Sequence, residues 1–165
     1  MRITQWGEYG IHCASFIASK ENAGALAVPA AEIAADQKIA LDYTQQILQR
    51  LRKNNIVKSI RGPQGGYKLA RPAKEISLKD ILVAAEGATF EIICDSKPIN
   101  KDCCAPGSPC NLRAVWRALK DHVDVFLTKY TLDDIVHSKT GLPDIDYKPI
   151  LIGGGNGVPA SPSQP

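Results

Sequence analysis

A helical pattern that leads directly into a hairpin pattern constrains the fold more than any other feature of this sequence. From Leu41 to Asn54, Thr44, Ile47, Leu48 and Leu51 recur at the spacing of one buried helix face. Residues 56–60 then alternate and are rich in β-branched side chains. A Gly/Pro turn occupies 61–66, and a second short strand follows at 67–69. A helix followed at once by a two-stranded hairpin is typical of a winged helix.

Two further helices are predicted before this unit. Apolar side chains from Trp6 to Ala18 have helical spacing, and Pro29 suits the start of a short helix from Ala30 to Asp36. A turn at 37–40 separates this short helix from the basic helix that begins at Leu41. Two short helices joined by a tight turn indicate a helix-turn-helix.

The second half of the sequence predicts one short helix and one long helix. Ser77 can cap a helix from Leu78 to Glu86 that Gly87 ends. From Leu112 to Tyr130 a continuous apolar stripe predicts a long dimerisation helix, although such a stripe can also pack only on its own domain. Residues 131–135 can add a last turn.

The expected fold class is therefore mainly α with a small β-hairpin wing. We expect a winged helix-turn-helix DNA-binding domain at 1–87, a cysteine-rich loop at 88–111, and the dimerisation helix at 112–137. The Gly/Pro/Ser-rich tail at 138–165 is expected to be disordered.

Charge separates the two halves of the chain. Residues 50–74 hold eight basic side chains and no acidic one, and residues 1–75 carry a net charge of +5 against −2 for residues 76–165. This distribution favours an N-terminal module that binds phosphates, although a solvated helix face would also explain a basic run.

The outer face of the 41–54 helix carries amides that can pair with adenine edges, and Asp42 can accept from cytosine unless it caps the helix. Arg50, Lys53 and Lys58 suit phosphates, and Arg61 beside Gly62 suits a narrow minor groove unless it is merely solvated. The predicted DNA-binding set is Asp42, Tyr43, Gln45, Gln46, Gln49, Arg50, Lys53, Lys58, Arg61 and Gly62.

Composition indicates an ordinary globular protein. The chain has 165 residues, of which 44% are hydrophobic, so one domain with appendages is expected. No apolar run approaches the ~20 residues that span a bilayer, and the first residues lack the features of a signal peptide. We therefore expect a cytoplasmic protein without a membrane segment.

Four of the five cysteines lie between Cys94 and Cys110, with eight residues between Cys94 and Cys103 and five between Cys104 and Cys110. The spacing contains neither a close zinc pair nor a C-x-x-C motif, and a wide Gly/Pro loop suits an iron–sulfur cluster. The adjacent Cys103 and Cys104 are expected to supply one ligand between them, and surface thiols without a metal are the alternative. Cys13 is expected in the core.

The sequence resembles the IscR/NsrR-type winged-helix transcription regulators, the Rrf-two family, over residues 1–135. The stretches 51–57 and 61–67 carry the resemblance most specifically, together with the opening residues and Trp116 after the cysteine loop. The resemblance implies a homodimer with crossed long helices that binds a pseudo-palindromic site on double-stranded DNA, and one cluster per protomer that tunes promoter affinity.

By the same resemblance, the cluster ligands are Cys94, Cys104 and Cys110, with Cys103 as a spare thiol or an alternative ligand. Some members use a histidine where this chain has Arg113, and others use a carboxylate from the partner, whose position Glu8 occupies. This departure favours the nitric-oxide and redox-sensing branch over the IscR-like branch. The expected cofactor is a 2Fe–2S cluster rather than 4Fe–4S.

Three functions remain open at this point. The first is a dimeric regulator controlled by an iron–sulfur cluster that senses redox state, nitric oxide or iron/cluster status. The second is the same regulator without a cluster, controlled by thiols or a protein partner. The third is a cysteine-dependent redox enzyme, but His122 and His137 lie far from the loop, so we expect no enzymatic activity.

Overall fold

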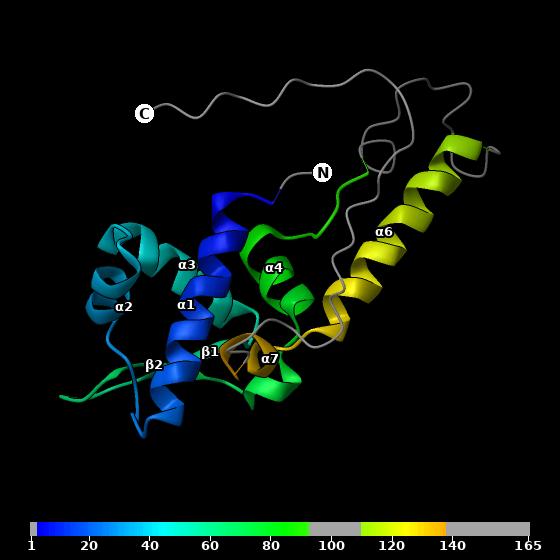
Figure 1. Cartoon of the computed structure of the whole chain (residues 1–165). Helices are drawn as coiled ribbons and strands as arrows, with labels where there is room; N and C mark the ends of the chain where they lie inside the picture. The colour runs from blue at the N-terminus through cyan, green and yellow to red at the C-terminus, as the bar shows by residue number, and fades with distance from the viewer. Residues whose placement is uncertain (1–2, 93–109, 138–165) are drawn as a thin grey trace, which may run out of the picture.

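The computed structural model describes residues 3–92 and 110–137. Figure 1 shows short helices gathered around α1, a two-stranded hairpin, and one long helix that projects from this body. In chain order the elements are α1 (Gln5–Asn22), α2 (Ala30–Gln37), α3 (Leu41–Lys53), β1 (Val57–Ile60), β2 (Gly66–Leu69), the 3₁₀ turn η1 (Ala73–Glu75), α4 (Leu78–Glu86), α6 (Asn111–Lys129) and α7 (Leu132–His137). The predicted winged-helix class is confirmed.

Helix α1 lies at the centre and packs closely on α4. Gly10 permits this approach, because a Cβ there would lie 3.1 Å from the Cβ of Ala85. Cys13 is fully buried, and desolvation raises the pKa of its thiol to about 12, so it behaves as the predicted small core residue. The helix continues to Asn22, beyond the predicted end at Ala18. Its last turn is tied to the wing, because Glu21 accepts a 2.6 Å hydrogen bond from the backbone N–H of Leu69.

Helices α2 and α3 form the predicted helix-turn-helix. The predicted stripe of α3 is buried, and the hydroxyl of Thr44 donates to the carbonyl of Ala40 at 3.1 Å. The capping interpretation of Asp42 is wrong, because Ala40 is the N-cap residue and no side chain caps the helix. Asp42 lies instead in the first turn, where its carboxylate is exposed and favoured by the helix dipole. Similarly, Pro29 precedes α2 as its N-cap rather than opening its first turn.

The wing is an antiparallel pair of strands that is anchored to the linker between α1 and α2. Val57 pairs with Leu69, and both are buried. Val28 and Tyr67 exchange two backbone hydrogen bonds of 2.8 Å each, which join the linker to β2. Gly66 is required there, since a Cβ would lie 2.4 Å from the carbonyl oxygen of Val28. This long-range bridge fixes the wing beside the helix-turn-helix.

Helix α4 has the predicted boundaries. Ser77 and Asp80 form a capping box at its start, and Gly87 ends it with a φ of +95°. The segment after α6 returns to this start: the N–H of Leu78 donates to Tyr130 and that of Leu132 to Ile76, at 2.9 and 2.8 Å. The predicted last turn is α7, and these bonds hold it against the body.

Asp124 attaches α6 to the winged-helix body. Its carboxylate accepts from Lys120 at 2.6 Å, from Thr89, and from Lys79 of α4 at 3.2 Å. Partial burial acts to raise the pKa of Asp124, but the hydrogen bonds from Lys120, Thr89 and Lys79 outweigh it and lower the pKa to about 2.

The rest of α6 extends beyond the body, and none of its residues is buried. None of the helices within residues 3–92 and 110–137 combines the length and the hydrophobicity of a membrane-spanning segment. The predicted cysteine loop lies largely outside the described residues, as does the tail expected to be disordered, so these domain boundaries remain predictions.

We expect Asp124→Asn to lower the free energy of unfolding by about 1–2 kcal/mol at pH 7, because charge-assisted hydrogen bonds are lost. Since the pKa of Asp124 is lower in the folded protein, its carboxylate stabilises the fold above about pH 4, and this contribution is lost as the pH falls towards 2. Urea unfolding at several pH values measures both effects. Asp121→Asn, on an exposed position of the same helix, is the matched control; equal stability of both variants would contradict the assignment.

Candidate nucleic-acid interface

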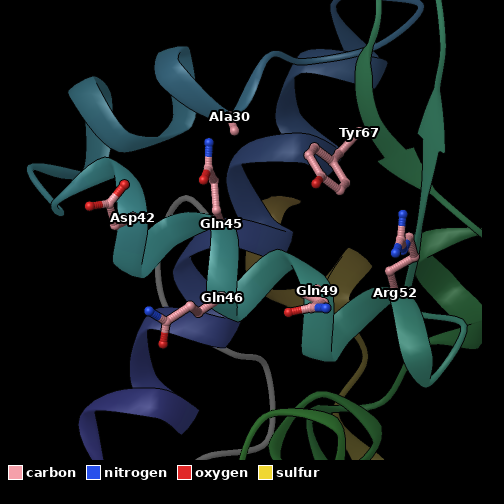
Figure 2. A pocket seen from close by; sticks show the side chains of 7 residues that line it. All are labelled: Ala30, Asp42, Gln45, Gln46, Gln49, Arg52 and Tyr67. Carbon is pink, nitrogen blue, oxygen red and sulfur yellow. The ribbon is translucent and has the colours of Figure 1, made fainter.

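A polar hollow of about 520 Å³ opens where α2, α3 and the wing converge. Figure 2 shows side chains of α3 lining it together with Ala30 at the start of α2 and Tyr67 of β2. We call this surface the recognition hollow, and its lining is Ala30, Asp42, Gln45, Gln46, Gln49, Arg52 and Tyr67. It is open and mostly polar, unlike the enclosed apolar pockets that hold small ligands.

The chemistry of the recognition hollow suits base edges in a major groove. Glutamine amides can donate to and accept from adenine, a carboxylate can accept from the amino group of cytosine, and arginine can donate to guanine. Helix α3 presents these groups along its exposed side, from Asp42 in the first turn to Arg52 near its C-terminus. The arrangement can therefore read sequence rather than only bind charge.

Four predicted residues, Asp42, Gln45, Gln46 and Gln49, are brought together in the hollow. Sequence reasoning missed Ala30, Arg52 and Tyr67 as parts of this surface. Helical spacing could have found Arg52, which follows Gln49 by three residues and Gln45 by seven. Tyr67 could not be found in this way, because its position depends on the bridge to Val28.

Arg50 and Tyr43 lie elsewhere. The guanidinium of Arg50 donates to the carbonyl of Ala85 at 2.7 Å and lies 4.0 Å above the ring of Trp6. Tyr43 packs on Trp6 and Tyr9, with ring centroids 4.5 and 5.8 Å apart, and burial followed by the influence of Tyr9 raises its pKa. Tyr43 therefore joins α3 to α1, and Arg50, although exposed, joins α3 to both α1 and α4. Because these contacts already occupy both side chains, we leave them out of the DNA-binding set proposed below.

The other predicted DNA-binding residues are exposed. Lys53 ends α3, and Lys58 lies on β1. Arg61 and Gly62 occupy the wing turn, where Gly62 has a φ of +117°, a conformation that glycine adopts without strain. Their contacts with DNA remain predictions.

The predicted metal ligands are described only in part. Cys94, Cys103 and Cys104 lie outside the described residues. Cys110 is the half-buried N-cap residue of α6, and Glu8 is exposed in the first turn of α1. His12, also exposed, follows Glu8 by one helical turn and so lies on the same face. Within residues 3–92 and 110–137, no three potential ligands form a group, so the ligand roles remain predictions.

Helix α6 presents an apolar face to solvent. Leu112, Val115, Leu119 and Phe126 are 55%, 59%, 41% and 52% exposed and share the helical spacing of the predicted stripe. Tyr130 at its end is buried against the body. The alternative in which the whole stripe packs on its own domain therefore does not describe this helix.

We expect Arg50→Ala to destabilise the protein by about 1–2 kcal/mol, because it removes a charged hydrogen bond and a cation–π contact. Lys53→Ala, one turn later and exposed, should change stability by less than about 0.5 kcal/mol. Thermal unfolding of both variants without DNA measures this difference. An Arg50→Ala protein as stable as wild type would restore Arg50 to the phosphate-binding candidates.

Comparison with known proteins agrees with this geometry. A family model described as "Rrf2: Iron-dependent Transcriptional regulator" matches residues 3–138. The chain is 35% identical over 146 residues to the HTH-type transcriptional regulator IscR of Pectobacterium carotovorum, covering 88% of this chain and 85% of that protein. It is also 35% identical over 139 residues to IscR of Escherichia coli, covering 84% and 82% of the two chains.

Solved structures agree as well. IscR of T. potens superposes with a TM-score of 0.62 at 28% identity, covering 82% of this chain and 86% of that one. CymR of B. subtilis, described as the global cysteine regulator, gives a TM-score of 0.62 at 28% identity, covering 82% and 96%. The predicted family resemblance is confirmed: the chain belongs to the Rrf2 family of DNA-binding transcription regulators.

Proposed function

We propose that this protein is a homodimeric regulator whose affinity for promoter DNA is controlled by a bound iron–sulfur cluster that responds to redox state, nitric oxide or iron/cluster status. The recognition hollow is the observation that supports DNA binding most directly. It combines the exposed amides of α3 with side chains of α2 and the wing, on the basic half of the chain.

DNA contacts divide into two kinds. Asp42, Gln45, Gln46, Gln49 and Arg52 face base edges when α3 enters the major groove. Lys53, Lys58, Arg61 and the backbone at Gly62 contact phosphates or the adjacent minor groove, and so fix the position of α3.

A second copy of the chain covers the apolar face of α6. A single protomer leaves large side chains of this face in water, and pairing two such helices would bury them. A two-fold dimer also presents two α3 helices to a pseudo-palindromic site with half-sites about one helical turn apart.

The donor set fits an iron–sulfur cluster, preferably 2Fe–2S. Cys94, Cys104 and Cys110 would supply thiolates, with Glu8 of the partner subunit as an oxygen ligand and Cys103 as the alternative thiol. Cys110 precedes the first turn of α6, where the helix dipole favours a thiolate. Glu8 is exposed, and no ion pair occupies it among the described residues. When bound, the cluster supplies iron centres that can change oxidation state or react with small molecules.

The turn of α1 that carries Glu8 also contacts α3. Trp6 packs on Tyr43 and lies beneath the guanidinium of Arg50, and both of these residues belong to α3. A displacement of this turn would therefore shift α3. A change in ligation at Glu8 would thereby alter the position of α3 relative to that of the partner subunit.

A second candidate keeps DNA binding but replaces the cluster with thiol or partner control. The similarity to a protein described as a global cysteine regulator favours it, since that structure shares the fold to the same extent as T. potens IscR.

We expect Gln46→Ala to change base preference at one position in each half-site, by about 1–3 kcal/mol, because one bidentate amide contact is lost. Selection of sites from a randomised duplex library measures the preference. Gln37→Ala, on α2 outside the recognition hollow, is the control. Unchanged selectivity of Gln46→Ala would show that the base-reading face is assigned incorrectly.

We expect Leu119→Glu combined with Val123→Glu to produce monomers with little affinity for a two-half-site duplex, because the pairing of α6 would bury unpaired charge. Sedimentation at micromolar concentration measures the assembly. Val125→Glu introduces the same charge on the opposite side of α6 and should leave the dimer intact. A monomeric wild-type protein would contradict the dimer.

We expect Cys94→Ala, Cys104→Ala and Cys110→Ala each to abolish the visible absorption of anaerobically purified protein, and Cys103→Ala to keep it. Glu8→Ala should retain a cluster with an altered spectrum or lifetime, because an oxygen ligand binds iron less strongly than a thiolate. His12→Ala, on the same helix face, tests whether the neighbouring imidazole takes part. A Glu8→Ala protein identical to wild type in spectrum, cluster lifetime and DNA affinity excludes the carboxylate as a ligand.

A further inference from the structure

The first turn of α1 has a cap to which a second helix contributes. Thr4 is the N-cap residue, and its hydroxyl accepts a 3.2 Å hydrogen bond from the backbone N–H of Trp6. In a capping box, the third residue of the helix also returns a side-chain oxygen to the N–H of the N-cap residue. In α1 this third residue is Gly7, which has no side chain. The N–H of Thr4 must therefore find its acceptor elsewhere.

Glu86, the half-buried last residue of α4, supplies this acceptor. Its Oε1 atom accepts a 2.9 Å hydrogen bond from the N–H of Thr4, although 82 residues separate the two in sequence. A Cβ on Gly7 would collide with the same oxygen. The carboxylate of Glu86 thus occupies the place of the missing side chain at position 7, and the capping box is completed from another helix.

The position of Glu86 is unfavourable for α4 itself. A carboxylate at the C-terminal end of a helix is opposed by the helix dipole, and the last turn of α4 contains no basic side chain that could compensate. At the first turn of α1 the dipole instead favours a negative charge. Glu86 therefore breaks a local rule of α4 and gains its stabilising contact from α1, a conflict that is typical of functional positions.

The capped turn carries both side chains through which α1 acts in the proposed function. Glu8 is the proposed oxygen ligand, and Trp6 lies beneath the guanidinium of Arg50 on α3. Glu86 in turn ends the helix that precedes the cysteine-rich segment at 88–111. One hydrogen bond thus joins the turn that carries the proposed ligand to the helix that leads into the cysteines.

We propose that Glu86 is a positioning residue for the cluster: it fixes the first turn of α1 and thereby holds Glu8 in place as a ligand of the cluster that the partner subunit binds. The inference rests on the proposed cluster. It adds a residue that neither ligates iron nor contacts DNA, and that acts through the backbone N–H of Thr4.

Glu86→Ala removes the acceptor and should melt close to wild type, because it also removes the unfavourable charge at the end of α4. In protein without a cluster, hydrogen exchange of the amides of residues 4–8 should become about fivefold faster, as the loss of one cap predicts. In anaerobically purified protein, the cluster lifetime should shorten several-fold. Glu86→Gln keeps an oxygen that can accept from Thr4 and should keep both values near those of wild type.

Gly7→Ala tests the same contact without removing the carboxylate. The new Cβ would collide with the Oε1 atom of Glu86 and with the side chain of Leu82, so the carboxylate should move away from Thr4. The cluster lifetime should shorten as in Glu86→Ala, and the double variant should show no more than the larger single effect. Glu75→Ala removes an exposed carboxylate of η1 and should change neither measurement.

Four results would overturn the inference and leave the proposed function intact. They are unchanged hydrogen exchange in Glu86→Ala, an unchanged cluster lifetime in Glu86→Ala, a Glu86→Gln protein as impaired as Glu86→Ala, and additive effects of Gly7→Ala and Glu86→Ala. A fifth is a further loss of lifetime when Glu86→Ala is added to Glu8→Ala, because Glu86 would then act by another route than Glu8. A wild-type protein that purifies without iron contradicts the proposed cluster and this inference together.

Discussion

The burial of one stripe of α3 determines which face of this helix can meet DNA. Ile47, Leu48 and Leu51 are fully buried, and each contributes about 1.5–3 kcal/mol relative to exposure. Thr44 can join this stripe because its hydroxyl donates to the carbonyl of Ala40 and is therefore paired although buried. Rotation of α3 by one residue would expose these side chains. The amide face is therefore fixed towards solvent before any DNA is present.

The remaining parts of the interface are positioned by long-range contacts with the region before α2. The bridge between Val28 and Tyr67 holds the wing beside α3, and Gly66 permits the close approach. On the other side of α3, Arg50 and Tyr43 pack on Trp6 of α1. Helix α3 thus lies between the surface proposed to face DNA and a surface packed on the N-terminal turn of α1.

Local features of the fold could be predicted from the sequence, and tertiary contacts could not. Periodicity predicted the buried stripe of α3, and capping chemistry predicted the boundaries of α4 from Ser77 to Gly87. The capping-box pattern that begins at Asp42 indicated the wrong N-cap residue, because the N-cap of α3 is Ala40, two residues earlier. Arg50 shares the basic run of a DNA-binding helix, but only the folded chain brings Ala85 and Trp6 within its reach. The proposed ligand set would take Glu8 from a partner subunit, and the sequence of one chain cannot show how two chains pack.

In the proposed mechanism, DNA recognition, dimerisation and a bound cluster act together, and the state of the cluster sets the affinity for DNA. The direct measurement is the affinity of one anaerobic preparation for one selected duplex, before and after the cluster is removed, with the dimer verified in both states. We expect the affinity to change by at least about tenfold, equivalent to about 1.4 kcal/mol of coupling. Equal affinity in the two states, across all duplexes that the protein selects, would contradict it.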